Sequence, residues 1–125
     1  MNVEGKRDLK DRTREFALRI VRFYAALPKS TVAQVLGKQL LRSGTSVGAH
    51  YREGTRSRSN AEFISKFEGA LQELEETRYW LELLAAEHIG SRGELESLTQ
   101  EADQLTGILI ASVMTVKLKR TRNDE

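Results

Sequence analysis

The chain has 125 residues, which suits one domain and is too short for two of ordinary size. Its 20 Lys+Arg and 18 Asp+Glu residues give a formal charge of only +2, which as a total argues against a uniformly basic nucleic-acid binder. The lack of cysteine excludes a disulfide scaffold, a thiolate zinc site and a cysteine nucleophile. The first residues contain no signal-peptide core, and no apolar run has the roughly 20 residues that span a membrane, so we expect a cytoplasmic protein.

A first helix is predicted from about Asp8 to Leu27, and Pro28 ends it. Its apolar residues recur at steps of seven, four, three and four, so they share one face: Leu9, Phe16, Ile20, Phe23 and Leu27. A second helix is predicted to begin at Ser30 or Thr31, with Thr31 and Gln34 spaced as in a capping box, and to fade between residues 54 and 57.

The second helix has a mixed inner face with two glycines. The expected inward residues are Val32, Val35, Leu36, Leu40, Ser43, Val47 and Tyr51. Gly44 and Gly48 lie one turn apart, and each costs about 0.5–1 kcal/mol relative to alanine in a helix. Their presence predicts either a close approach of another helix or a local bend.

The third and fourth helices have the clearest boundaries. Ser59 and Glu62 form a capping box at the start of the third helix, and Gly90 suits the residue that follows its end. The expected inward residues of the third helix are Phe63, Phe67, Ala70, Leu74, Thr77, Leu81 and Leu84. Those of the fourth are Leu95, Leu98, Ala102, Leu105, Leu109, Val113 and Val116.

These four segments predict an all-α protein. Long helices joined by short turns pack as antiparallel neighbours, so we expect an up-down antiparallel four-helix bundle over residues 8–120. Residues 1–7 are predicted to be a flexible N-terminus, and residues 121–125 a frayed C-terminal tail.

The small net charge conceals a strong segregation of charge along the chain. Residues 1–58 hold 13 Lys+Arg and 5 Asp+Glu, a net +8; residues 59–105 hold 3 and 11, a net −8; residues 106–125 add a net +2. At 100° per residue, Lys38, Arg42, Arg52 and Arg56 fall within about 40° of one direction, opposite the inner face of the second helix. Arg58 lies just beyond this basic stripe.

Two interpretations of the segregated charge remain open. The basic stripe could bind phosphates with a salt-sensitive affinity. Alternatively, the charges could form solvated faces that guide helix pairing or self-assembly. Glu68, Glu75 and Glu82 recur every seven residues and form an acidic stripe on the third helix. Tyr79 and Trp80 partly leave the apolar face nearby and could contribute to an interface.

No motif indicates catalysis. His50 and Glu53 have the reverse of the Glu-x-x-His order that di-iron bundles use, and no phosphate loop or nucleophile elbow is present. We therefore expect no enzyme activity, no metal site and no cofactor. Arg78 falls within the apolar arc of the third helix, so we expect it to pair with an acid, with Glu53 or Glu15 as the first candidates, or to lie at a subunit interface.

Three stretches are distinctive in combination: residues 43–54 (SGTSVGAHYREG), 59–67 (SNAEFISKF) and 74–84 (LEETRYWLELL). Together they resemble the four-helix-bundle proteins named for the intervening sequences of bacterial 23S rRNA genes, over about residues 12–109. The resemblance implies a bundle that assembles into a ring-like homopentamer. It also implies distant similarity to the accessory variability protein of diversity-generating retroelements, which binds nucleic acid and a reverse transcriptase.

The resemblance assigns structural roles to individual residues. The family pattern matches this chain at Ser46, Val47, Glu53, Gly54, Ser59, Glu62, Phe63, Glu76 and Thr77. Family members commonly carry asparagine where this chain has His50. These matches imply caps, helix junctions and interfaces.

Our leading hypothesis is a non-enzymatic homo-oligomer that binds RNA or DNA through basic surface stripes. The expected contact residues are Lys38, Arg42, Arg52, Arg56 and Arg58, with Lys10 and Arg14 as additions on the first helix. The alternative is a protein-interaction scaffold that does not bind nucleic acid. Its interface would then include Glu68, Glu75, Glu82, Tyr79 and Trp80.

Overall fold

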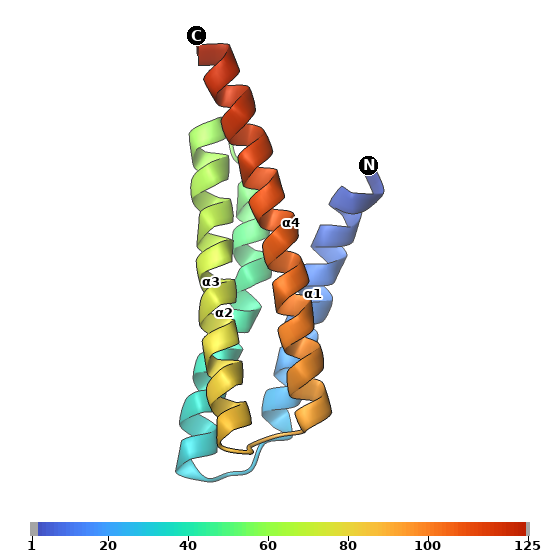
Figure 1. Ribbon diagram of the computed structural model, residues 1–125, viewed down its shortest axis with the longest axis vertical. Coiled ribbons are helices and arrows are strands. Elements are labelled where there is room, and N and C mark those ends of the chain that lie inside the picture. The colour runs from blue at the N-terminus through green and yellow to red at the C-terminus, as the bar shows by residue number, and fades with distance from the viewer. Residues whose placement is uncertain (1–2, 125) are drawn as a thin grey trace.

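The computed structural model describes residues 3–124, with side chains from residue 9 to residue 121. Its four helices are α1 (Val3–Ala25), α2 (Thr31–Thr55), α3 (Asn60–Ala86) and α4 (Arg92–Asp124). They run up and down in antiparallel order, with the α1–α2 and α3–α4 turns at one end and the α2–α3 turn at the other (Figure 1). The predicted all-α four-helix bundle is confirmed.

The first and last helices extend beyond the predicted limits of the bundle, residues 8 and 120. α1 begins at Val3 rather than Asp8, and α4 continues through residues 121–124. Residues 1, 2 and 125 lie outside the described residues, so the flexibility of both ends stays a prediction. Within the described residues, none of the helices combines the length and the apolar character needed to cross a bilayer.

The helix caps follow the sequence signals with two corrections. Helix α3 ends at Ala86 with Glu87 as its C-cap, and the residue after the cap is His88 in the left-handed conformation (φ 57°), so the prediction of Gly90 for that position is wrong. Ser59 Oγ accepts a hydrogen bond from the Glu62 amide at 3.0 Å, as a capping box requires.

At α2 the N-cap is Ser30, whose Oγ accepts from the Ala33 amide at 3.3 Å, so the predicted pairing of Thr31 with Gln34 is wrong. Gln34 instead donates to the Pro28 carbonyl at 2.9 Å and accepts from the Tyr24 hydroxyl at 2.8 Å, which ties α2 to the end of α1.

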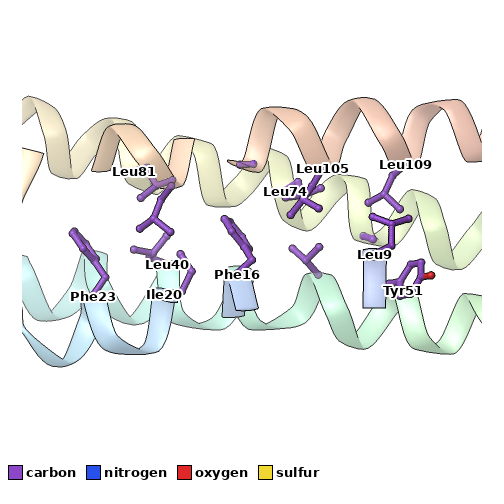
Figure 2. Close-up of a cluster of buried hydrophobic side chains, with 14 of the residues drawn as sticks. Leu9, Phe16, Ile20, Phe23, Leu40, Tyr51, Leu74, Leu81, Leu105 and Leu109 are labelled. Atoms are coloured by element: carbon purple, nitrogen blue, oxygen red, sulfur yellow. The ribbon is translucent and has the colours of Figure 1, made fainter. Parts of the chain in front are cut away.

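The core is a column of side chains contributed by all four helices (Figure 2). Its fully buried members include Phe16, Ile20, Leu40, Leu74, Leu81, Leu105 and Leu109. The predicted inward faces of α1, α3 and α4 are buried or half-buried throughout. In α2, however, Val32 and Val35 are 54% and 56% exposed, and Ala33 and Gly37 take the buried positions.

Three glycines of α2, Gly37, Gly44 and Gly48, mark close contact with α1 rather than a bend. A Cβ at Gly37 would lie 2.7 Å from Leu27, one at Gly44 2.9 Å from Ile20, and one at Gly48 3.2 Å from Thr13. Carbon atoms normally approach to about 3.5–4.0 Å, so a larger side chain would push the two helices apart. The α1–α2 spacing therefore depends on residues without side chains.

Helix α1 departs from α4 toward its N-terminus. Its contact with α4 is the smallest of the helix interfaces, and the N-terminal part of α1 diverges from α4 in Figure 1. Two arginines join the helices further along. Arg12 donates to Glu101 at 2.8 and 3.1 Å, and Arg19 Nη2 donates to Ser97 at 2.7 Å. The end of the bundle that holds the α2–α3 turn is thus its more open end.

Candidate nucleic-acid interface

The basic residues of α2 lie on its solvent face and at its C-terminal end. Lys38, Arg42 and Arg52 are exposed, Arg56 is the C-cap residue, and Arg58 follows in the turn that leads to α3. At 1.5 Å per residue, Lys38 and Arg52 are about 21 Å apart along the helix. The stripe therefore consists of two groups, one near the middle of α2 and one at the α2–α3 turn.

Acidic partners separate these two groups further. Arg42 Nη2 donates to Glu76 at 2.5 Å, and its Nη1 lies 3.4 Å from Glu73. Glu73 is largely buried, with 15% of its side chain exposed. Arg42 is therefore held against α3 and its charge is locally neutralised, which makes it a poor phosphate ligand.

The α2–α3 turn retains its positive charge. Across the described part of the chain, Arg52, Arg56 and Arg58 form no side-chain ion pair, and all three are exposed. Glu53, which directly follows Arg52, forms an ion pair with Lys66 instead, with Nζ and Oε1 3.1 Å apart. Glu62 accepts a hydrogen bond from the Arg58 amide at 3.1 Å as part of the α3 cap. We call Arg52, Arg56 and Arg58 the junction arginines.

The two candidate contacts on α1 differ from each other. Lys10 is exposed and unpaired within the described residues, and it lies toward the N-terminus of α1, at the end of the bundle where α2 stops. Arg14 pairs with its neighbour Glu15 at 3.2 Å, with both side chains more than half exposed. An exposed ion pair of this kind is weak, so Arg14 can leave Glu15 to bind a phosphate.

The residues matched by the family pattern have structural partners. Ser46 donates to the Arg42 carbonyl at 2.7 Å, and the hydroxyls of Thr77 and Ser43 lie 2.9 Å apart in the core between α2 and α3. Gly54 packs directly against the Phe67 ring, and Phe63 stacks on Phe67 with centroids 4.0 Å apart. The contacts of Gly54 and Phe63 with Phe67 join the end of α2 to the first turns of α3.

A polar cluster behind Arg42 was not predicted. His50 Nε2 lies 3.7 Å from Glu73 Oε2, and His50 Nδ1 is buried without a hydrogen-bond partner. The ring packs over Gly69, where a Cβ would lie 3.0 Å from Nδ1. Within the residues that the structure describes, no group of three or more His, Cys, Asp or Glu side chains could hold a metal ion.

The acidic residues of α3 are divided between an ion pair and a groove. Glu68 accepts from Lys117 at 3.2 Å. Glu75, Glu82 and the 52% exposed Tyr79 line a groove of about 940 Å³ between α3 and α4. Trp80 does not line it, because its ring packs against the core and its Nε1 is buried without a partner.

Arg78 has a different partner from either one expected. Its Nε lies 2.7 Å from Asp103 Oδ1 on α4, and both side chains are about half exposed. The prediction of an acidic partner is therefore confirmed, whereas the candidates Glu53 and Glu15 are wrong. The side chain leaves the apolar arc of α3 and reaches across the α3–α4 groove.

Helix α4 has an outward apolar face that its core pattern does not reveal. Ile110, Met114 and Leu118 follow at steps of four and are 48%, 52% and 68% exposed. They lie on the side of α4 opposite the buried Leu105, Leu109 and Val113. Exposed apolar side chains gathered on one face are typical of an interaction surface.

The chain is similar to proteins of one family. The family model described as 23S rRNA-intervening sequence protein matches residues 6–111. A crystal structure of a protein of unknown function from the S23 ribosomal protein family of Bacteroides thetaiotaomicron is 43% identical, with a TM-score of 0.77. The match covers 84% of this chain and 97% of that one, and no curated protein matches. This chain therefore belongs to the 23S rRNA-intervening sequence protein family.

Proposed function

We propose that this protein is a non-enzymatic, homo-oligomeric helical bundle that binds RNA or DNA through its basic surface. One observation carries the proposal: the three junction arginines are exposed at one end of the bundle and have no acidic partner among the described residues. Each can neutralise a phosphate and release a counterion, which favours binding without sequence preference. Lys10 adds positive charge at the same end of the bundle, whereas Lys38 belongs to the separate group near the middle of α2, where Arg42 is held by α3.

Binding of this kind has a defined salt dependence. Three phosphate contacts give a slope of about −2.7 for log K against log salt on duplex DNA. A rise from 50 to 200 mM salt should then weaken binding by about 40-fold per bound protomer. Self-assembly would present several junctions together and raise the affinity without new contacts.

The test is fluorescence anisotropy with an RNA hairpin and a DNA duplex over a salt series. Arg52→Glu combined with Arg56→Glu should weaken binding to both probes and lower the slope by about two. Arg22→Glu combined with Lys29→Glu is the matched control, since it reverses two exposed cations near the opposite end of the bundle and changes the net charge equally. Salt-insensitive binding, or equal losses in the two variants, would contradict the proposal.

The homo-oligomer is supported by the outward apolar face of α4 as well as by the family resemblance, which implies a pentamer. Met114→Glu with Leu118→Glu should reduce the native mass measured by light scattering, because it places charges among apolar contacts. Glu75→Lys with Glu82→Lys tests the predicted acidic interface in the same assay. Unchanged mass in both double variants would exclude both faces from the subunit interface.

The groove between α3 and α4 favours a second candidate function, a protein-interaction scaffold. Its walls combine the acidic Glu75 and Glu82 with the exposed ring of Tyr79. The two arginines that also line it are each paired with an acid, Arg78 with Asp103 and Arg92 with Glu96. Such a surface suits a basic protein segment and repels nucleic acid. Co-purification of a protein partner that Tyr79→Ala releases, with no nucleic acid bound, would favour the scaffold over the leading proposal.

A further inference from the structure

A second hollow lies beside the junction arginines. It has a volume of about 550 Å³ and is bounded by the end of α2, the α2–α3 turn, the start of α3, and facing residues of α1 and α4. Its apolar wall consists of Leu9, Tyr51, Phe63, Phe67 and Val116. Its polar wall includes Ser57, Arg58 and Asn60.

The hollow is the unfilled end of the hydrophobic core. Leu9 and Tyr51 lie together at one end of the buried column in Figure 2. There α1 has diverged from α4 (Figure 1), so the two helices do not close over the aromatic side chains. The exposed opening is therefore a consequence of the splayed packing of α1.

The aromatic wall has the geometry of a stacking platform. Phe63 stacks on Phe67 at 4.0 Å between centroids, and Phe67 contacts Tyr51 at 5.4 Å. Phe67 and Tyr51 are buried, whereas Phe63 is only half-buried and lines the hollow. Because Phe63 is held from behind by Phe67, its ring is already fixed before a ligand arrives.

The polar wall complements a nucleotide. Arg58 lines the hollow, Arg56 lies two residues before it, and Arg52 lies in the last turn of α2. The Asn60 side chain is exposed and makes no hydrogen bond within the part of the chain that the structure describes, so its amide can both donate to and accept from a base edge. Aromatic ring, amide and guanidinium thus surround one space.

We propose that this hollow binds one unpaired nucleotide of the nucleic acid, with its base on Phe63, its base edge at Asn60 and its phosphate at Arg58. The proposal rests on the proposed function, because the junction arginines bind the rest of the strand. A base inside a duplex cannot reach an aromatic wall of this kind without leaving its stack. Single strands and unpaired loops present free base faces, so they are the substrates that this site selects.

The first test compares a twelve-nucleotide single strand with a twelve-base-pair duplex, using full-length protein. Phe63→Leu keeps the apolar packing and removes the ring. It should weaken single-strand binding on the order of tenfold and leave duplex binding unchanged. Phe23→Leu, a core aromatic variant near the opposite end of the bundle, is the control for lost stability and should leave both affinities unchanged.

The second test uses a nucleoside 5′-monophosphate and records amide chemical shifts. The Asn60 and Phe63 amides should shift with the monophosphate and not with inorganic phosphate, and Phe63→Leu should abolish the response. Equal loss of single-strand and duplex binding in Phe63→Leu would overturn the pocket and leave the arginine interface standing. If the wild-type protein binds neither oligonucleotide, the proposed function fails. The proposed nucleotide site is then refuted as well, unless the nucleoside monophosphate shifts the Asn60 and Phe63 amides.

Discussion

Substituting Gly54 by alanine should destabilise the protein, although the same change stabilises most exposed helices. A Cβ at Gly54 would lie 2.5 Å from both Cδ1 and Cε1 of Phe67 and 3.3 Å from the Lys66 Cβ. Phe67 is only 2% exposed and is stacked on Phe63, so its ring cannot simply turn into solvent. Moving it by about 1 Å would restore normal carbon–carbon contact but disturb the aromatic cluster.

The expected magnitude is the sum of two opposing contributions. Overpacking of a buried site costs about 1–3 kcal/mol, and replacing glycine in a helix gains about 0.5–1 kcal/mol. Gly54→Ala should therefore lose up to about 2.5 kcal/mol. Gly107 is the matched control, because a Cβ there would meet nothing within 4 Å. Gly107→Ala should gain about 0.5–1 kcal/mol.

The assay is urea unfolding followed by circular dichroism, with all variants at the same protein concentration because an oligomer's stability depends on it. Adding Phe67→Leu to Gly54→Ala should cost less than the two single losses together, since leucine leaves room for the new methyl group. If Gly54→Ala is as stabilising as Gly107→Ala, the close contact between the end of α2 and α3 does not exist as described.

Two further predictions concern charge and ionisation. Arg12→Ala should lower the free energy of unfolding by about 1–3 kcal/mol, because Arg12 binds the half-buried Glu101. Arg14→Ala should lower it by less than about 1 kcal/mol, because the Arg14–Glu15 pair is exposed. Urea unfolding of both variants checks this. Burial raises the pKa of the Tyr51 hydroxyl, so its contribution to stability is complete below about pH 10 and is lost as the pH rises through the raised value in the folded protein. Unfolding midpoints between pH 8 and 11.5 should show Tyr51→Phe losing less stability than wild type, and parallel curves would contradict this prediction.

The sequence was sufficient for the bundle because helix existence and inward faces depend on local periodicity. Phe16, Leu74 and Leu105 are buried as their spacing predicts. The failures at Val32 and Val35 have a tertiary cause. Both lie in the first turns of α2, where α1 approaches so closely that the buried positions go to Ala33 and Gly37 instead. Hydrophobicity alone assigns the larger residues inward and cannot anticipate this contact.

The candidate site was less predictable than the fold because ion pairs depend on which residues face each other across two helices. Arg42 and Arg52 look equivalent on a helical projection, yet only Arg42 lies opposite Glu73 and Glu76. Arg78 met Asp103 for the same reason, since the register of α3 against α4 is absent from single-helix periodicity. The hollow beside Phe63 was also missed, because it arises from the divergence of α1 from α4.

Folding changes the meaning of the segregated charge. Acids of α3 and α4 pair with Arg12, Arg19 and Arg42, so three of the cations of residues 1–58 are neutralised along the sides of the bundle and the net charge of this half stays positive. Within the described residues, the exposed and unpaired Arg52, Arg56 and Arg58 lie close together at the α2–α3 turn, whereas Lys38 lies near the middle of α2 and Arg22 and Lys29 lie near the opposite end. On the flank, Glu75 and Glu82 of the α3–α4 groove repel a polyanion. Nucleic acid should therefore approach the end of the bundle rather than its side. In a cyclic assembly whose symmetry axis runs along the helices, every subunit presents that end on the same face, so one rim would carry all the junction arginines.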